Sequence, residues 1–252
     1  MPSSIALETL ETCVVPIVRL KVEEPRKTIE TAVHLLKTGK LLALPTDTVY
    51  GLAASAKNRD ACLQLYHVKG RQHAKPLAIS VGRVDDVYKW GEVPFSDELL
   101  NALLPGPVTL LLKPKQGQLL PLPEDPELVG IRVPDHDFPR AVANELGFPI
   151  ALTSANISGE PSSLDPLEFK SIWPKLSAVF DGGIIENNDE VQYIVRTYFV
   201  WNNIIMTFSQ ASRSGSTVID LSKKGYFKII RAGVGFSNTK QLLLDHGLEE
   251  QS

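Results

Sequence analysis

Short apolar runs alternate with helix-like segments along almost the whole chain, and this alternation constrains the fold more than any other feature. The clearest example is an apolar run at Leu41–Leu44, followed by a polar turn, an amphipathic segment and a second apolar run at Leu77–Val81. Strands that alternate with helices favour an α/β fold with a largely parallel or mixed sheet. We therefore predict this fold class.

The same patterns place the individual elements and their ends. Asn58 and Asp165 are expected to cap helices, and Asp137 to cap a helix that ends at Gly147. No linker-like or low-complexity segment interrupts the series, so we predict one domain. Strands are expected at residues 17–21, 41–44, 77–81, 108–112, 129–133, 149–153, 178–180, 217–221 and 227–231. Helices are expected at residues 28–38, 58–68, 84–90, 96–104, 138–146 and 237–246, with one more starting at 165.

A concentration of positive charge follows the first polar turn. Between Lys57 and Val84 the chain carries six Lys or Arg residues and a single acid, Asp60, so this stretch has a net charge of about +5. The whole chain has a formal net charge of −3. A concentrated positive site favours an anionic ligand such as a polyphosphate. The pI near 6.0 argues against a general nucleic-acid-binding surface.

Several function classes lack their sequence signals. Cys13 and Cys62 have no C-x-x-C spacing, and the five histidines have no metal-ligand spacing. There is no G-x-S-x-G elbow and no G-x-x-x-x-G-K-[ST] phosphate loop. No apolar run approaches the roughly 18 residues of a membrane span, and the acidic N-terminus is a poor targeting signal. We therefore expect no membrane span and a cytoplasmic location.

Polar residues stand at the ends of several expected strands. Thr46–Thr48 and Ser154–Ser158 each follow an apolar run directly, while Arg231 ends another strand. Ligands in open α/β sheets bind outside strand ends, so these residues are expected to converge. The turns also have a purely structural explanation, because Thr, Asp and Ser side chains commonly bond the local backbone. Arg132 is a sharper candidate, since an arginine between Ile and Val in a strand must point towards a partner or solvent.

Seven sequence blocks between about residues 27 and 235 are LPTDTVYGLA, YHVKGRQHAKPLAI, LLPGPVTLLL, VGIRVPDH, ALTSANISGEPS, FDGG and GSTVIDL. Among them, K-x-R at Lys69 and Arg71 is paired with S-x-N at Ser154 and Asn156. With these blocks the chain resembles the YrdC/Sua5 family, the threonylcarbamoyl-AMP synthases. The resemblance implies a single YrdC-like domain, in which a twisted, open mixed sheet with flanking helices surrounds a deep positive cavity.

The resemblance also implies a reaction. L-threonine, bicarbonate or CO2 and ATP would give L-threonylcarbamoyladenylate and pyrophosphate, which makes the protein a nucleotidyltransferase. The adenylate would feed the t6A37 modification of tRNA, which a separate tRNA threonylcarbamoyltransferase complex completes. Mg²⁺ is implied as the companion of ATP, bound mainly through phosphates and water.

Individual residues receive roles from the same resemblance. An arginine such as Arg132 can bind an amino acid's carboxylate as a two-pronged fork, and Lys69 and Arg71 would neutralise phosphate charge as pyrophosphate leaves. The residues on the threonine side are Thr48, Ser80, Arg132, Ser154 and Thr217. Those on the nucleotide side are Arg71, Lys75, Leu128, Asn156, Ser162 and Arg231. The catalytic set is Lys69, Arg71, Ser154 and Asn156, and no residue is assigned to a metal.

Two features depart from the family pattern. The family's R-P-G is Arg231-Ala232-Gly233 here, and a long connection separates FDGG from GSTVIDL. The extra part, roughly residues 191–210, has five aromatic residues and little charge. It is either an extra hairpin on the sheet or an inserted or mis-spliced segment that the core fold does not need. We therefore divide the chain into an unassigned extension, residues 1–24, and a YrdC-like domain, residues 25–252, with an atypical insertion at about 191–210.

Other functions stay open at this point. A double-stranded RNA-binding module without synthase activity is the alternative from another class, because the resemblance also allows RNA binding and the insertion could impair catalysis. A carbamoyl-transfer domain like that of hydrogenase maturation proteins is the alternative enzyme, but the chain lacks zinc-finger and acylphosphatase-like modules. A mitochondrial fraction is considered beside the cytoplasmic location.

Overall fold

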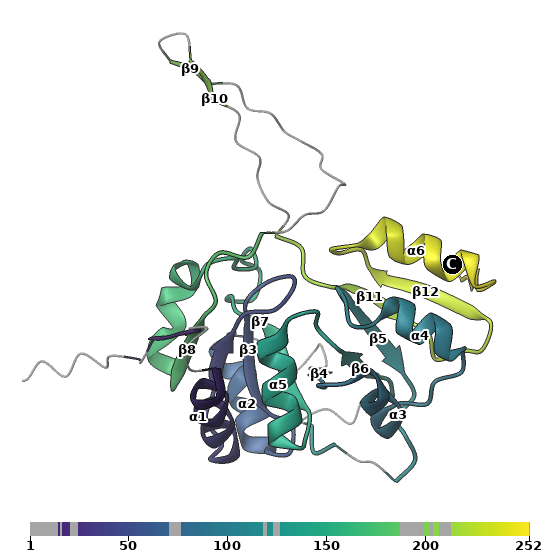
Figure 1. Cartoon of the computed structure of the whole chain (residues 1–252), viewed down its shortest axis with the longest axis horizontal. Coiled ribbons are helices and arrows are strands. Elements are labelled where there is room, and N and C mark those ends of the chain that lie inside the picture. The colour runs from purple at the N-terminus through teal and green to yellow at the C-terminus, as the bar shows by residue number, and fades with distance from the viewer. Residues whose placement is uncertain are drawn as a thin grey trace, which may run out of the picture.

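The computed structural model describes residues 15, 17–20, 25–70, 77–117, 120–122, 127–186, 199–201, 204–206 and 213–251. Within these residues, eleven strands form one mixed sheet in the order β1-β8-β2-β3-β7-β4-β6-β5-β11-β12-β13, with helices packed on its faces (Figure 1). The predicted α/β class, with a twisted open sheet and flanking helices, is confirmed.

The elements have the following bounds. The strands are β1 (Ile17–Arg19), β2 (Leu42–Leu44), β3 (Gly51–Ser55), β4 (Ala78–Ser80), β5 (Val108–Leu112), β6 (Val129–Arg132), β7 (Ile150–Ser154), β8 (Ala178–Asp181), β9 (Phe199–Trp201), β10 (Ile204–Met206), β11 (Thr217–Asp220), β12 (Tyr226–Arg231) and β13 (Glu249–Glu250). The α-helices are α1 (Pro25–Lys37), α2 (Arg59–Val68), α3 (Val87–Trp90), α4 (Asp97–Leu103), α5 (Asp137–Leu146) and α6 (Phe236–Asp245). Two 3₁₀ segments are η1 (Val84–Asp86) and η2 (Pro166–Lys175).

Strands β2 and β7 run in one direction, and β4 and β6 run in the other. β2 pairs antiparallel with β3, β3 with β7 and β7 with β4, whereas β4 and β6 are parallel. The carboxyl ends of β2 and β7, at Leu44 and Ser154, therefore lie at one edge of the sheet, while Ser80 and Arg132 end strands that point to the other edge. The expected convergence of strand ends does not follow from strand direction, because that rule holds for parallel strands.

Different helices cover the two faces of the sheet. Helices α1 and α5 pack against each other and enclose one core cluster with Leu42 and Leu44 of β2. Helix α2 and the 3₁₀ segment η2 contribute to a larger cluster that includes Ala43. Neighbouring residues of β2 thus enter different clusters, because successive side chains of a strand point to opposite faces. The apolar run of β2 is therefore a strand that is buried on both faces.

Most of the predicted helix ends are confirmed. Asn58 caps α2 by accepting the backbone N–H of Ala61 at 3.0 Å. Gly147 ends α5 with a φ of 69°, in the left-handed region that favours glycine. Asp165 caps η2 with its side chain, although the segment that it begins is 3₁₀ rather than α-helical.

The predicted cap of α5 is wrong by one residue. His136, not Asp137, precedes the helix in extended conformation, and its Nδ1 atom accepts the N–H of Phe138 at 3.2 Å. Asp137 is instead the first helical residue, where its negative charge suits the positive end of the helix dipole. A neutral imidazole provides the same kind of acceptor as a carboxylate, so the sequence preference for Asp did not decide the position.

Strand β3 was not predicted. The sequence pattern predicts a polar turn and then a helix after β2, whereas Gly51–Ser55 forms a fully buried strand between β2 and β7. A Cβ atom on Gly51 would lie 2.7 Å from Cδ1 of Leu152, so a larger residue here would have to displace that side chain. Because small residues such as Gly and Ala have low strand propensity, the segment carried no local strand signal.

The atypical segment contains a hairpin. Strands β9 and β10 pair antiparallel in a two-stranded sheet of their own, apart from the eleven-stranded sheet. The expected hairpin is therefore present, but its placement on the main sheet is wrong. The rest of residues 191–210 lies outside the described residues. Among the described residues, we find no helix with the length and apolar character that a membrane crossing requires.

Candidate functional site

The connection between β2 and β3 is built around Thr46. Its hydroxyl donates to the carbonyl of Val49 at 2.7 Å and accepts the N–H groups of Thr48 and Val49 at 3.1 and 3.2 Å. Thr46 thus has the structural role expected of a turn residue. This turn leaves the side chains of Asp47 and Thr48 free to face Arg132, with which they form a second set of contacts.

Arg132 connects this turn to the other half of the sheet. Its Nη2 atom donates to Oδ1 of Asp47 and, at 2.7 Å, to Oγ1 of Thr48. Ser80 lies directly beside Arg132, because the two residues are paired in the register of β4 and β6. We call Asp47, Thr48, Ser80 and Arg132 the Arg132 cluster. The reach of the arginine side chain and the six-residue turn bring these groups together, despite the opposite strand directions.

The Arg132 cluster contains most of the unpaired polar atoms of the described core. Among the described residues, four buried side-chain atoms have no hydrogen-bond partner, and three of them are Asp47 Oδ2, Ser80 Oγ and Arg132 Nε. A buried polar atom without a partner costs about 1–3 kcal/mol, so such atoms are rare and usually have a functional explanation. Three of them in one cluster indicate a place for a polar ligand.

The electrostatics of the cluster favour a ligand with negative charge. Burial lowers the pKa of the Arg132 guanidinium, Asp47 acts in the opposite direction, and the positive charge of Arg231 lowers this pKa further. Arg231 is therefore near enough to influence Arg132. Arg132 is paired with Asp47, and Arg231 adds a second positive charge in its neighbourhood, which favours an anionic group.

A second cluster surrounds Lys69, which follows the last turn of α2. The three N–H groups of its ammonium are shared among four acceptors: the carbonyl and hydroxyl of Ser154 at 2.6 and 3.2 Å, and the carbonyl and Oδ1 of Asn156 at 3.0 and 3.1 Å. The Ser154 hydroxyl also donates to Asn156 Oδ1 at 2.5 Å. We call these three residues the Lys69 cluster. The K-x-R and S-x-N motifs thus meet directly, and a buried positive charge lies under the Ser154–Asn156 loop.

Tyr50 connects the two clusters. Its carbonyl accepts the N–H of Ala155 at 2.7 Å, and its neighbour Gly51 is paired with Ser154. Its hydroxyl donates to the carbonyl of Gly183 at 2.7 Å and accepts the N–H of Gly182 at 3.0 Å. Burial raises the pKa of this hydroxyl, so it stays a neutral donor. The hydroxyl of Tyr50 therefore links the PTDTVYG turn to the two glycines of the FDGG block.

Arg231 belongs to a third group of polar residues at the start of β11. Its Nη2 atom donates to the carbonyl of Ser216 at 2.7 Å, and burial lowers its pKa. The hydroxyl of Thr217 donates to the carbonyl of Val234 at 2.9 Å and accepts the N–H of Gly233 at 3.1 Å. Thr217 is therefore fully buried and occupied by backbone partners. A Cβ atom on Gly233 would lie 2.2 Å from the carbonyl oxygen of Gly215, so the glycine of the R-A-G turn is required there.

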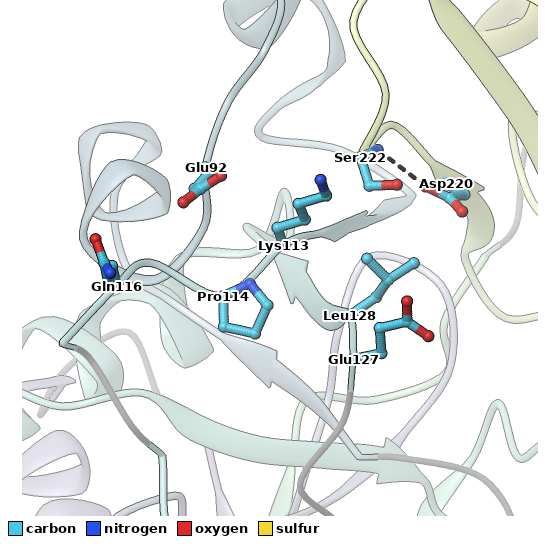
Figure 2. Close-up of a pocket in the computed structure, with 8 residues that line it drawn as sticks. All are labelled: Glu92, Lys113, Pro114, Gln116, Glu127, Leu128, Asp220 and Ser222. Carbon is cyan, nitrogen blue, oxygen red and sulfur yellow. Dashed lines mark hydrogen bonds between the residues drawn. The ribbon is translucent and has the colours of Figure 1, made fainter.

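The remaining predicted residues are Arg71, Lys75 and Leu128. Arg71 and Lys75 lie outside the described residues. Leu128 borders a hollow of about 640 Å³ that also contains Lys113, with Glu92 on one side and Asp220 and Ser222 on the other (Figure 2). With three carboxylates and one lysine, this hollow is not the positive cavity expected from the resemblance. That expectation stays a prediction, since two of its cations are not described.

A further hollow, of about 540 Å³, lies beside Asn156. Arg213 and Glu168 line it and form a two-pronged pair, with nitrogen–oxygen distances of 2.7 and 2.8 Å. Arg213 also donates to the carbonyl of Ser162 at 3.2 Å. Ser162 is one of the residues predicted on the nucleotide side. This pair therefore ties the loop after Asn156 to the segment that leads into β11.

Sequence reasoning did not select three residues that organise the site: Asp47, Tyr50 and Arg213. Asp47 was visible between two threonines, but its turn composition gave an adequate local explanation. The partners of Tyr50 and Arg213 lie 133 and 45 residues away, so no local pattern marks them.

Comparisons with known proteins agree with the architecture and the motifs. The family model Sua5_yciO_yrdC, described as telomere recombination, matches residues 34–199. A protein named threonylcarbamoyl-AMP synthase from Bos taurus is 43% identical over 220 residues, which cover 87% of this chain and 73% of that protein. The protein of the same name from Homo sapiens is 42% identical over 215 residues, covering 85% of this chain and 70% of the relative.

Solved structures show the same fold. Pyrococcus abyssi Sua5 complexed with L-threonine superposes with a TM-score of 0.73 at 25% identity, covering 94% of this chain and 62% of that one. The chain thus spans about three fifths of the Sua5 protein. Escherichia coli YciO superposes with a TM-score of 0.67 at 20% identity, covering 89% of this chain and 97% of that one, and supports the fold alone.

Proposed function

The chain belongs to the Sua5–YciO–YrdC family, and we propose that it acts as a threonylcarbamoyl-AMP synthase. In this reaction L-threonine and CO2 or bicarbonate give a carbamate, whose oxygen attacks the α-phosphorus of ATP and expels pyrophosphate. The observation that carries the proposal is the Arg132 cluster, where a buried guanidinium and a buried hydroxyl hold unpaired atoms beside a carboxylate. Such a group of side chains suits an amino acid.

The Arg132 cluster is the threonine side of the proposed site. The Pyrococcus abyssi relative was solved with L-threonine, and we assign the same ligand here. Arg132 Nε and Ser80 Oγ suit the carboxylate, and the hydroxyl of Thr48, which accepts from Arg132 and contacts Thr46 Oγ1 at 3.2 Å, lies beside them. Ser154 lies where this side meets the Lys69 cluster. Thr217 would act indirectly, because its hydroxyl already holds the turn beside Arg231.

The nucleotide side lies, in this proposal, between the Lys69 cluster and Arg231. Asn156, Ser162, Leu128 and the two undescribed cations, Arg71 and Lys75, complete it. The donors of Lys69 are bonded to the Ser154–Asn156 loop, so Lys69 first of all positions that loop. Its buried charge still acts on phosphates at a distance, since electrostatic attraction is stronger in a site from which water is excluded.

Catalysis would depend mainly on positioning. The amino nitrogen of threonine attacks CO2 to form the carbamate, and the carbamate oxygen then displaces pyrophosphate at the α-phosphorus. Holding the three reactants in line converts a multimolecular process into an effectively unimolecular one. The cations around the phosphates stabilise the charge that develops on the leaving pyrophosphate.

Mg²⁺ enters the proposal only as the companion of ATP. The described residues contain no group of three or more His, Cys, Asp or Glu side chains that could hold a metal. In the proposal the ion is bound mainly through the phosphates of ATP and water, as is common for Mg²⁺.

The further expectations stay predictions. They comprise use of the product for t6A37 in tRNA, a downstream tRNA threonylcarbamoyltransferase complex, double-stranded RNA binding, and a cytoplasmic location with a mitochondrial fraction.

A pyrophosphate-release assay tests the proposed function. With ATP, Mg²⁺, bicarbonate and labelled L-threonine, the protein should release pyrophosphate only when threonine is present and should form the labelled adenylate. Lys69→Ala and Asn156→Ala should reduce this rate by about a hundredfold or more, the size of effect typical for lost electrostatic stabilisation. Lys170→Ala, a change at an exposed lysine of η2, is the control and should leave the rate unchanged. An absence of threonine-dependent pyrophosphate release would rule the function out.

A further inference from the structure

The contact between Arg132 and Asp47 is only half of the pairing that these groups can form. An arginine and a carboxylate commonly make two parallel hydrogen bonds, with two nitrogens facing two oxygens. Here only Nη2 and Oδ1 are joined, while Arg132 Nε and Asp47 Oδ2 are buried without partners. Each unpaired atom is covalently linked, through one carbon, to an atom of the bond that is made. These two atoms therefore leave one donor and one acceptor beside the bond that is made, each available to a third group.

The unpaired acceptor is the more informative of these atoms. Arg132 Nε and Ser80 Oγ can both donate to a carboxylate, as the proposed threonine side requires. Asp47 Oδ2 cannot, because an ionised carboxylate only accepts hydrogen bonds and repels a second carboxylate. It requires a donor, and a positively charged donor suits it best. An α-amino acid carries such a donor, since one carbon separates its ammonium group from its carboxylate.

We infer that Asp47 binds the α-ammonium group of the amino-acid substrate through Oδ2, while its Oδ1 atom holds Arg132 for the substrate carboxylate. This inference rests on the proposed function. It makes Asp47 a substrate-binding residue that selects a free amino group, the group whose nitrogen reacts. The carboxylate of Asp47, next to Thr48, would thus orient the amino group, which becomes the nucleophile once the ammonium loses a proton, as well as the acid group.

The charges around Asp47 are compatible with this role. Arg132 contacts it directly, and Arg231 affects Arg132 from further away. Burial lowers the pKa of His136, and Asp47 acts in the opposite direction on it, together with Asp135 and Asp137. His136 is therefore a neutral neighbour at neutral pH, and it does not compete for Oδ2 as a cation. Two arginines and one aspartate leave the site able to hold a zwitterion together with an anionic nucleotide.

A simpler explanation is that Asp47 only positions Arg132. The two explanations differ in what happens to a ligand that has a carboxylate but no amino group. If Asp47 acts only through Arg132, its loss weakens every ligand with a carboxylate by the same factor. If Oδ2 binds the ammonium group, its loss weakens only ligands that have one.

Calorimetric binding of two ligands to the full-length protein separates these explanations. The ligands are L-threonine and (R)-3-hydroxybutyrate, which has the same carboxylate and hydroxyl but lacks the amino group. Wild-type protein should bind threonine about ten- to a hundredfold more tightly, the usual worth of a charge-assisted hydrogen bond. Asp47→Asn keeps an oxygen that can accept from Arg132 and removes the charge. It should reduce this preference to a few-fold by weakening threonine alone.

Ser80→Ala is the matched control, because the hydroxyl of Ser80 is assigned to the carboxylate. It should weaken both ligands by a similar factor and leave the preference for threonine intact. Equal weakening of both ligands by Asp47→Asn would overturn the inference and leave the synthase function standing. If Asp47→Asn does not fold, the wild type alone decides: equal affinity for both ligands also overturns the inference. No threonine binding by the wild type would overturn the proposed threonine side itself, and the inference with it.

Discussion

Tyr50 shows how much of this site depends on a single side chain. Its backbone connects the two halves of the site, and its hydroxyl is the link to Gly182 and Gly183 in the FDGG block. The residue is fully buried. Both partners of the hydroxyl are backbone groups, one a carbonyl and one an N–H.

We predict that Tyr50→Phe destabilises the protein by about 1–3 kcal/mol, because it leaves the buried groups of Gly182 and Gly183 without their partner. Thermal and urea unfolding measure this loss. Tyr88→Phe is the control: Tyr88 is exposed, its hydroxyl donates to Asp97 at 2.5 Å, and its removal should cost much less. Equal effects of the two substitutions would contradict the buried role of the Tyr50 hydroxyl.

We predict that His136 makes the stability of the protein depend on pH. Its Nδ1 atom caps α5 only while the imidazole is neutral, and burial lowers its pKa in the folded state below the ordinary value. The unfolded chain, with a histidine pKa of about 6.5, then binds the proton more tightly than the folded one. The contribution of His136 to stability is complete above about pH 6.5 and is lost as the pH falls towards the folded-state pKa.

Unfolding free energies between pH 7.5 and 5.5 test this sign. The wild type should lose more stability over that range than His136→Asn, which keeps an acceptor at the cap without a titrating ring. An equal pH dependence of both proteins would show that His136 does not titrate differently in the folded and unfolded states.

At the scale of elements, separate contacts hold the Ser154–Asn156 loop and the segment that follows it. On the inner side, Ser163 donates to the carbonyl of Ala155 at 2.8 Å. On the outer side, Glu168 of η2 and Arg213 before β11 form their two-pronged pair. The same Glu168 accepts the N–H of Leu164 at 2.9 Å, and Arg213 lowers the pKa of this carboxyl. Two elements far apart in the chain therefore hold Ser162 and Leu164, in the segment that follows this loop.

We predict that Arg213→Ala raises KM for ATP severalfold and changes KM for threonine little, because Ser162 on the nucleotide side loses the hydrogen bond that Arg213 gives its carbonyl. Both partners of the ion pair are about one third exposed, so the loss of stability should stay near or below about 1 kcal/mol. Steady-state kinetics together with thermal unfolding measure the two effects.

Charge exchange is the control for Arg213. The double variant Arg213→Glu with Glu168→Arg should recover part of the affinity for ATP that each single variant loses. Arg26→Ala, which breaks an exposed pair with Glu30 on α1, should change neither KM nor stability appreciably. A similar increase of both Michaelis constants in Arg213→Ala would point to a general structural role instead.

At the scale of the whole molecule, one large sheet carries all three polar groups of the site. Strands β3, β7, β4 and β6 lie side by side at its centre and hold the Arg132 and Lys69 clusters, while β11 and β12 bring Arg231. Strands β9 and β10 do not join this sheet (Figure 1).

We predict that deletion of residues 191–210 changes the melting temperature by no more than a few degrees, because β9 and β10 pair with each other and not with the main sheet. Thermal unfolding of the shortened protein measures this, and the pyrophosphate assay shows whether the segment affects activity. A deletion within the sheet, such as removal of β13, is the comparison, since β13 pairs with β12. A large loss of stability on deletion of 191–210 would show that the segment belongs to the core, and would also contradict the proposed boundaries of the domain.

The sequence by itself determined the α/β class, the position of most strands and helices, the caps at Asn58 and Asp165, and the family. These features depend on apolar periodicity, on capping residues or on contiguous motifs, all of which a short window of sequence contains. The sequence did not predict β3, whose small residues form a strand because they lie between β2 and β7. There the neighbouring strands, and not local propensity, decide the conformation.

Only the tertiary structure decided how the site is assembled. Asp47 meets Arg132 and Lys69 meets Ser154 across 85 residues in each case. Such contacts depend on the order, register and twist of the sheet, which no local pattern contains. The same holds for the unpaired atoms Asp47 Oδ2 and Arg132 Nε, because burial without a partner is a property of the packed molecule. The residue types indicate binding of an anion and an amino acid. The folded sheet determines which of their atoms remain free to bind these ligands.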